Sequence, residues 1–180
     1  MANFIIRAFQ RRKLRKLPCV NRRIYTSFDD AQKVAFVFNS QTPRIDEAIK
    51  LFEKAMKEMN ISYRGLGISF TKDETTNPKL DHDPYIVQIL SKETNWLDIP
   101  IIEQAEEFYN GEYDILFDFS LDTSFTIKYS LKRCKCNMVV GYSPDMQNIY
   151  DIFIGDGGRE RSIVERIEYT IGYISTIKSK

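Results

Sequence analysis

The sequence predicts an α/β fold, in which a single three-layer domain with a mostly parallel β-sheet follows a basic N-terminal arm. Short apolar runs rich in β-forming residues alternate along the chain with segments whose apolar residues recur at helical spacing. Such alternation is typical of βαβ units, whose right-handed crossovers place helices on both faces of a parallel sheet. The 180 residues, of which 43% are hydrophobic, suffice for one core domain of about 150 residues and an appendage.

The first element is a short helix predicted over residues 3–17, whose apolar residues form only a partial stripe. The first buried strand follows at residues 34–38, where the apolar run is continuous. A helix is expected over residues 43–59, because its apolar residues recur at helical spacing. Thr42 is its predicted N-cap, and Pro43 is its predicted first residue.

The remaining elements continue the alternation of strands and helices. Strands are expected at 63–70, 85–90, 113–119, 138–141 and 150–154, and helices at 101–109, 123–133 and 162–177. The strand at 85–90 follows a polar loop, so we expect it at an edge of the sheet. These elements predict a single Rossmann-like domain over residues 29–180.

Several polar residues follow the ends of the predicted central strands. Ligands of open parallel sheets bind beyond the carboxyl ends of the strands, where the strand order reverses. If the strands at 34–38 and 113–119 are neighbours there, a crevice forms between their ends. Its candidate ligand-binding residues are Asn39, Ser40, Asp118, Ser120, Asp122, Gly141 and Tyr142. The alternative is that such residues cap helices and turns. Asp118 needs a partner in either case, because a buried unpaired carboxylate is unfavourable.

The sequence contains no recognisable catalytic residue, metal site or cofactor motif. Gly65 and Gly67 lie inside a strand and lack the spacing of a phosphate-binding loop. The only histidine, His82, lies between two aspartates but has no nucleophile with which to form a relay. Three cysteines, Cys19, Cys134 and Cys136, do not complete a tetrahedral zinc site and fit a reducing cytoplasm. The N-terminal apolar run is too short for a signal peptide or a membrane span, so we expect a cytoplasmic protein.

The basic arm, residues 1–28, gives the strongest functional signal. Its cations are Arg7, Arg11, Arg12, Lys13, Arg15, Lys16, Arg22 and Arg23, and it contains no Asp or Glu. The other 18 Lys and Arg face all 25 Asp and Glu, so the remainder of the chain has a net charge of −7. This asymmetry favours a polyanionic partner. We interpret the arm as a docking element for structured RNA, with ribosomal RNA and neighbouring ribosomal proteins as the expected partners.

Two other functions remain open from the sequence. The first is peripheral attachment to the inner membrane surface, with the helix at 3–17 lying in the interface and Phe4, Ile5, Phe9 and Leu14 inserted. The second is a small enzyme or ligand-binding domain that uses the crevice above the sheet. No nucleophile or cofactor motif accompanies that crevice, so we expect a non-catalytic protein.

Two family resemblances accompany these patterns. Through residues 95–96, 112–120, 138–141 and 151–154, the chain resembles an uncharacterised domain family of Bacteroidetes proteins over nearly its whole length. This resemblance implies the same fold and a bacterial cytoplasmic location, and it brings no established activity. Residues 113–142 are similar to the N-terminal half of lipopolysaccharide heptosyltransferases. Those enzymes bind their nucleotide-sugar donor in a second α/β domain, which 180 residues are too few to contain.

Overall fold

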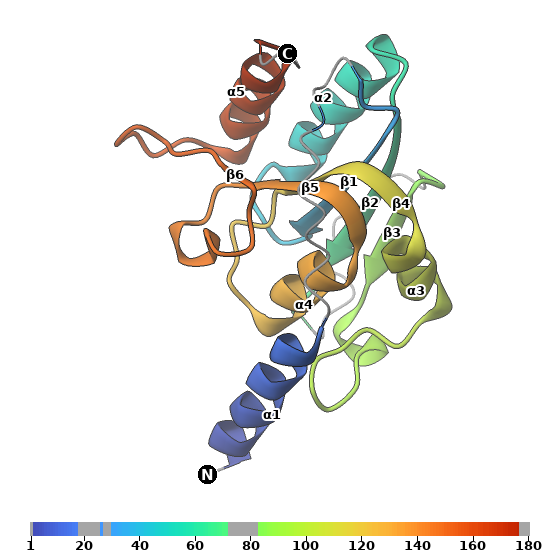
Figure 1. The fold of residues 1–180 in the computed structure, drawn as a ribbon, viewed down its shortest axis with the longest axis vertical. Helices are drawn as coiled ribbons and strands as arrows, with labels where there is room; N and C mark the ends of the chain where they lie inside the picture. Colours follow the sequence, from blue (N-terminus) through green and yellow to red (C-terminus); the bar gives the residue numbers. More distant parts are fainter. Residues whose placement is uncertain (1, 18–25, 27–29, 72–82, 177–180) are drawn as a thin grey trace.

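The computed structural model describes residues 2–17, 26, 30–71 and 83–176 (Figure 1). The strands of this part of the chain are β1 (Lys33–Asn39), β2 (Ser62–Ile68), β3 (Ile86–Ile89), β4 (Glu112–Asp118), β5 (Lys135–Gly141) and β6 (Ile152–Phe153). The helices are α1 (Ala2–Lys16), α2 (Ile45–Glu58), α3 (Glu103–Asn110), α4 (Phe125–Arg133) and α5 (Ile163–Thr176). The strands form one sheet in the order β3-β2-β1-β4-β5-β6, and every adjacent pair is parallel. The predicted Rossmann-like α/β fold is confirmed.

Helices cover both faces of the sheet, as the alternation of apolar segments predicts (Figure 1). Successive side chains of a strand point to opposite faces, so β1 supplies both cores. Phe36 and Phe38 pack with α2 and α5 on one face. Ala35 and Val37 pack with α3 and α4 on the other. Because β1 is buried on both faces, its sequence is a continuous apolar run rather than an alternating one.

The glycines of β2 make room for aromatic rings from β1. A Cβ at Gly65 would lie 2.6 Å from the ring of Phe36, and one at Gly67 would lie 2.5 Å from the ring of Phe38. Both separations are shorter than side-chain packing allows, so a larger residue at either position would have to displace a fully buried ring. The glycine pair therefore serves packing, in agreement with the interpretation that it is no phosphate-binding loop.

The start of α2 differs from the sequence prediction. The helix begins at Ile45, and the residue before it is Arg44 in a left-handed conformation (φ 61°) without a side-chain cap. A hydrogen bond from the Ile45 amide to the carbonyl of Thr42 closes a turn instead. The predicted N-cap at Thr42 is therefore wrong, because local turn hydrogen bonds replace the cap.

Strand β6 is shorter than the predicted strand at 150–154. The amide of Val139 donates to the side chain of Asp151 (2.9 Å) where a longer ladder would offer a backbone carbonyl. Tyr150, just before it, is buried against the α3 and α4 face of the sheet. Both features end the regular pairing before β6 begins.

Candidate functional site

The predicted crevice residues lie at the carboxyl edge of the sheet, where β1 and β4 end. These two strands are neighbours, and the strand order reverses at this point. Asn39 ends β1, Asp118 ends β4 and Gly141 ends β5. Three of the predicted crevice residues thus end neighbouring strands at the same edge of the sheet.

Asp118 is buried and fully hydrogen-bonded. Its Oδ1 accepts from the amide (2.9 Å) and hydroxyl (2.5 Å) of Ser120, and its Oδ2 accepts from the hydroxyl of Tyr150 (2.6 Å). Burial raises the pKa of Asp118, while the hydrogen bonds from Ser120 and Tyr150 act in the opposite direction. The ring of Tyr150 lies where a Cβ on Gly141 would be, so glycine at this strand end lets the tyrosine reach Asp118.

The neighbouring polar residues close the turn from β4 into α4. Asp122 accepts from the amide of Ser124 (2.6 Å) and, more weakly, from the side-chain amide of Asn39 (3.5 Å). Ser124 in turn caps α4 by accepting from the amide of Ile127 (3.4 Å). Asp122 and Ser124 thus have the turn-closing and capping roles that the sequence left open as an alternative.

The remaining two crevice candidates are Tyr142, which packs on the α2 and α5 face of the sheet, and Ser40. The Tyr142 hydroxyl donates to the carbonyl of Arg166 (3.1 Å) and lies 2.5 Å from the Thr170 hydroxyl, which ties the end of β5 to α5. Ser40 is buried, and its hydroxyl has no hydrogen-bond partner within the described residues. Tyr142 packs in the α2 and α5 core, whereas Tyr150 packs in the other. The ligand crevice at these strand ends stays a prediction.

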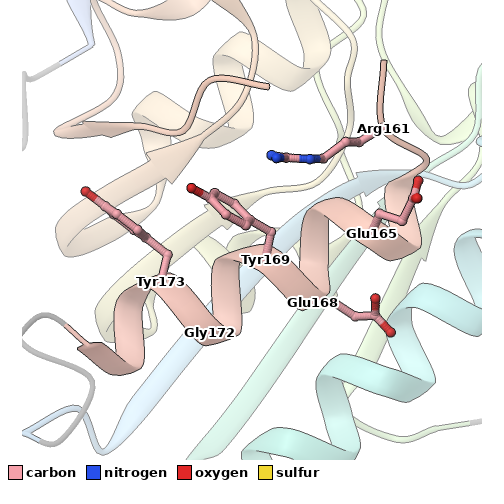
Figure 2. A pocket seen from close by; sticks show the side chains of 6 residues that line it. All are labelled: Arg161, Glu165, Glu168, Tyr169, Gly172 and Tyr173. Carbon is pink, nitrogen blue, oxygen red and sulfur yellow. The ribbon is translucent and has the colours of Figure 1, made fainter. Parts of the chain in front are cut away.

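A shallow groove of about 660 Å³ lies on the outer face of α5 (Figure 2). Its lining residues are Arg161, Glu165, Glu168, Tyr169, Gly172 and Tyr173. The rings of Tyr169 and Tyr173 are stacked, with centroids 6.1 Å apart, and the Arg161 guanidinium lies 4.3 Å from the Tyr169 centroid. Figure 2 shows Glu168 pointing away from the two rings. Sequence reasoning missed this groove, although two tyrosines four residues apart on the polar side of the helix were a detectable signal.

Helix α1 is docked on the domain through one side. The Gln10 side chain donates to the carbonyl of Leu97 (3.2 Å) and to the carboxylate of Asp98 (2.9 Å). Leu14 and Leu17 pack against the α3 and α4 core. The helical part of the predicted arm is therefore in contact with the α/β domain, and its N-terminal end points away from it (Figure 1).

The cations of α1 occupy the surface that docking leaves open. Arg7, Arg11, Arg12, Lys13, Arg15 and Lys16 are all exposed. No helix in the described part of the chain combines the length and apolarity that crossing a bilayer requires. The other two predicted RNA-binding residues, Arg22 and Arg23, lie outside the described residues.

The two cysteines in the described part of the chain, Cys134 and Cys136, are buried. Burial raises the pKa of Cys136 to about 12 and that of Cys134 well above its usual value, which disfavours the reactive thiolate. Within residues 2–17, 30–71 and 83–176, no cluster of three His, Cys, Asp or Glu could hold a metal ion. Cys19 and His82 lie outside the described residues.

The half-buried carboxylate of Glu53 on α2 makes stability depend on pH. Burial, and secondarily the neighbouring Asp83 carboxylate, raise the pKa of Glu53 to about 7. Between pH 4.5 and 7 the folded chain retains a proton that the unfolded chain has lost, so the free energy of unfolding falls as pH rises through this window. We expect Glu53→Gln to raise that free energy by about 1 kcal/mol at pH 8, because the group is only partly desolvated.

Urea denaturation at pH 5 and pH 8 measures this effect. The gain for Glu53→Gln should be larger at pH 8 than at pH 5. The exposed Glu58→Gln on the same helix is the matched control, and its unfolding free energy should follow the wild type at both pH values. An equal effect of Glu53→Gln at the two pH values would contradict the prediction.

Three comparisons place the chain among known proteins. The search of curated proteins finds no match. The solved structure of E. coli heptosyltransferase WaaC with ADP is similar, with a TM-score of 0.49 and 10% identity over 82% of this chain and 48% of that chain. The present chain thus spans about half the length of that protein. The sequence profile of a family of unknown function (DUF6913) matches residues 3–174, a range that begins within α1, so the chain belongs to this family.

Proposed function

We propose that the protein binds structured RNA through α1 and that its α/β domain serves as a non-catalytic body. The observation that carries this proposal is the set of six exposed cations on α1, a helix that contains no acidic residue. Lys and Arg that neutralise phosphates release condensed counterions, which supplies affinity without any sequence preference. Arginine also binds phosphate through two parallel hydrogen bonds.

The docking of α1 separates the side chains that contact the body from those that remain exposed. Gln10, Leu14 and Leu17 recur at helical spacing and face the body. The exposed cations are spread around the rest of the helix together with Phe4, Ile5 and Phe9, so a bound helix offers charge to phosphates on more than one side. A helix inserted between RNA backbones meets phosphates in this manner, whereas a flat anionic surface meets only one side of the helix.

The distribution of apolar residues favours RNA over a membrane surface. A helix that lies in the interface needs a continuous apolar face with the charges on the opposite side. In α1, Leu14 and Leu17 are used by the body, and the exposed Phe4, Ile5 and Phe9 are interspersed among the cations. This arrangement lacks the segregation of faces that membrane insertion requires.

The ribosome is the proposed location, in the bacterial cytoplasm and beside other ribosomal proteins. The net charge of the chain outside the arm is −7, so phosphates repel the body while they attract the helix. Such a molecule is suited to insert α1 into folded RNA and to leave the body at its surface. The hydrogen bonds that Asp118 accepts from Ser120 and Tyr150 are consistent with a structural role for this carboxylate in the body.

The salt dependence of binding tests this proposal. If about five to eight cations of the arm each neutralise a phosphate, the logarithm of affinity should fall with the logarithm of salt with a slope of roughly −4 to −7. Co-sedimentation with purified ribosomes and filter binding to a ribosomal RNA fragment, from about 50 to 300 mM KCl, measure this slope. A wild-type protein that fails to co-sediment with ribosomes at low salt would contradict the proposal.

A further inference from the structure

The only tryptophan of the chain, Trp96, is exposed beside the basic helix. Its side chain is 64% exposed, and Phe9 of α1, which is 46% exposed, meets it edge to face with ring centroids 5.7 Å apart. Two large aromatic side chains from segments 87 positions apart in the sequence thus form one exposed cluster. Aromatic pairs are normally driven into the core by their large apolar area, so an exposed pair indicates a binding surface.

The loop that presents Trp96 is held by several hydrogen bonds. The side-chain oxygen of Asn95 accepts from the backbone amides of Leu97 (2.9 Å) and Ile99 (3.2 Å). The backbone amide of Asn95 donates to the carbonyl of Ile99 (2.9 Å). Gln10 of α1 also donates to the carbonyl of Leu97 in the same loop. Because the backbone on both sides of Trp96 is fixed, a ligand that binds there does not have to order it.

Cations flank the aromatic pair on α1. Arg12 and Lys13 follow Phe9 by three and four residues, which places them next to it on the helix surface, and both are exposed. The nearby Asp98 carboxylate accepts from Gln10, so it is already hydrogen-bonded within the protein. Aromatic rings beside Lys and Arg are the combination that holds an unpaired nucleotide, with the base stacked and the phosphate neutralised.

We propose that Trp96 and Phe9 form a stacking site for an unpaired base of the RNA that α1 binds. This inference rests on the proposed function, and it adds that the preferred RNA has a loop or bulge next to its helical part. Stacking accepts any base, because every base has an aromatic face. The site therefore selects for unpaired structure and not for sequence.

Fluorescence of Trp96 gives a direct readout, because no other tryptophan contributes. Two RNAs of equal length are compared, a hairpin with an unpaired loop of about six nucleotides and a fully paired duplex, in line with the size of other single-strand sites. The hairpin should quench the Trp96 emission strongly, because a stacked base is in contact with the indole. The duplex should quench it only weakly. Equal quenching by the two RNAs would overturn the stacking site.

Substitution separates stacking from charge. Trp96→Ala should lower affinity for the hairpin about 10- to 100-fold while leaving the affinity for the duplex and the salt slope unchanged. Trp96→Phe should retain most of the hairpin affinity. The matched control is Ile101→Ala, another exposed apolar side chain close by in the sequence, which should change neither affinity. Anisotropy of end-labelled RNA measures all four proteins, and circular dichroism checks their fold.

The outcomes distinguish this inference from the function on which it rests. If Trp96→Ala binds the hairpin as tightly as the wild type and with the same salt slope, the stacking site is wrong and RNA binding by α1 stands. If the wild type binds neither RNA, both fail. The emission of Trp96 is also measured with vesicles containing about one third phosphatidylglycerol. An indole that enters lipid shifts its emission to shorter wavelength. Such a shift with vesicles, without quenching by either RNA, would show that the partner is a membrane surface and not a nucleic acid.

Discussion

Replacing Arg11, Arg12, Arg15 and Lys16 of α1 with Gln is expected to weaken binding to structured RNA at least about 100-fold at 100 mM salt. Each lost phosphate contact removes counterion release, so the salt slope should become shallower by about 3 to 4. The fold should persist, because all four side chains are exposed and Gln has nearly the helix propensity of Arg and Lys. Filter binding over a salt series measures both quantities.

A second quadruple variant removes the same net charge from the body. Lys50, Lys54, Lys57 and Lys135 are exposed, and the first three belong to α2, on the opposite face of the sheet from α1. Their replacement with Gln should lower RNA affinity by less than about 3-fold, through the long-range field alone. Equal losses in the two variants would show that net charge, and not α1, governs binding.

The membrane alternative is tested by a complementary change in α1. Phe4 and Ile5 are 78% and 55% exposed and lie outside the proposed stacking site. Phe4→Ser with Ile5→Ser should leave ribosome co-sedimentation unchanged, because neither side chain offers charge to a phosphate. Release of the doubly substituted protein from its cellular partner, with all cations intact, would instead support insertion into lipid.

The second large effect is expected for stability, at the Asp118 network. Tyr150→Phe leaves one oxygen of a buried carboxylate without its donor and should lower the free energy of unfolding by about 2 to 3 kcal/mol. Asp118→Ala should cost about 3 to 4 kcal/mol, because Ser120 and Tyr150 both lose their acceptor. Urea denaturation followed by circular dichroism measures these values.

The same variants separate a structural Asp118 from a ligand-binding one. RNA affinity and salt slope should stay within about 2-fold of the wild type, because the network lies within the body and away from the α1 cations. Tyr169→Phe is the control, since Tyr169 is exposed on α5 and its loss of a hydroxyl should leave stability unchanged. If Asp118 variants fold stably but lose cellular function, Asp118 contacts a ligand at the strand ends instead.

Local pattern alone predicted most of the secondary structure. The continuous apolar run of β1 and the helical spacing of apolar residues in α2 each report burial along a single segment. The alternation of such segments then sufficed for the parallel sheet and for the gathering of Asn39 and Asp118 at one edge, since carboxyl ends of parallel strands meet there. The charge of α1 was likewise readable from the sequence.

Which groups meet was decided only by the tertiary structure. Tyr150 reaches Asp118 across 32 positions, and Trp96 meets Phe9 across 87, so no short window of sequence contains either pair. The strand order brings the first pair together, and the docking of α1 creates the second while choosing which of its sides stays exposed. Periodicity encodes how deeply a residue is buried, but the identity of its neighbour depends on how separate segments pack, and that information is distributed over the whole chain.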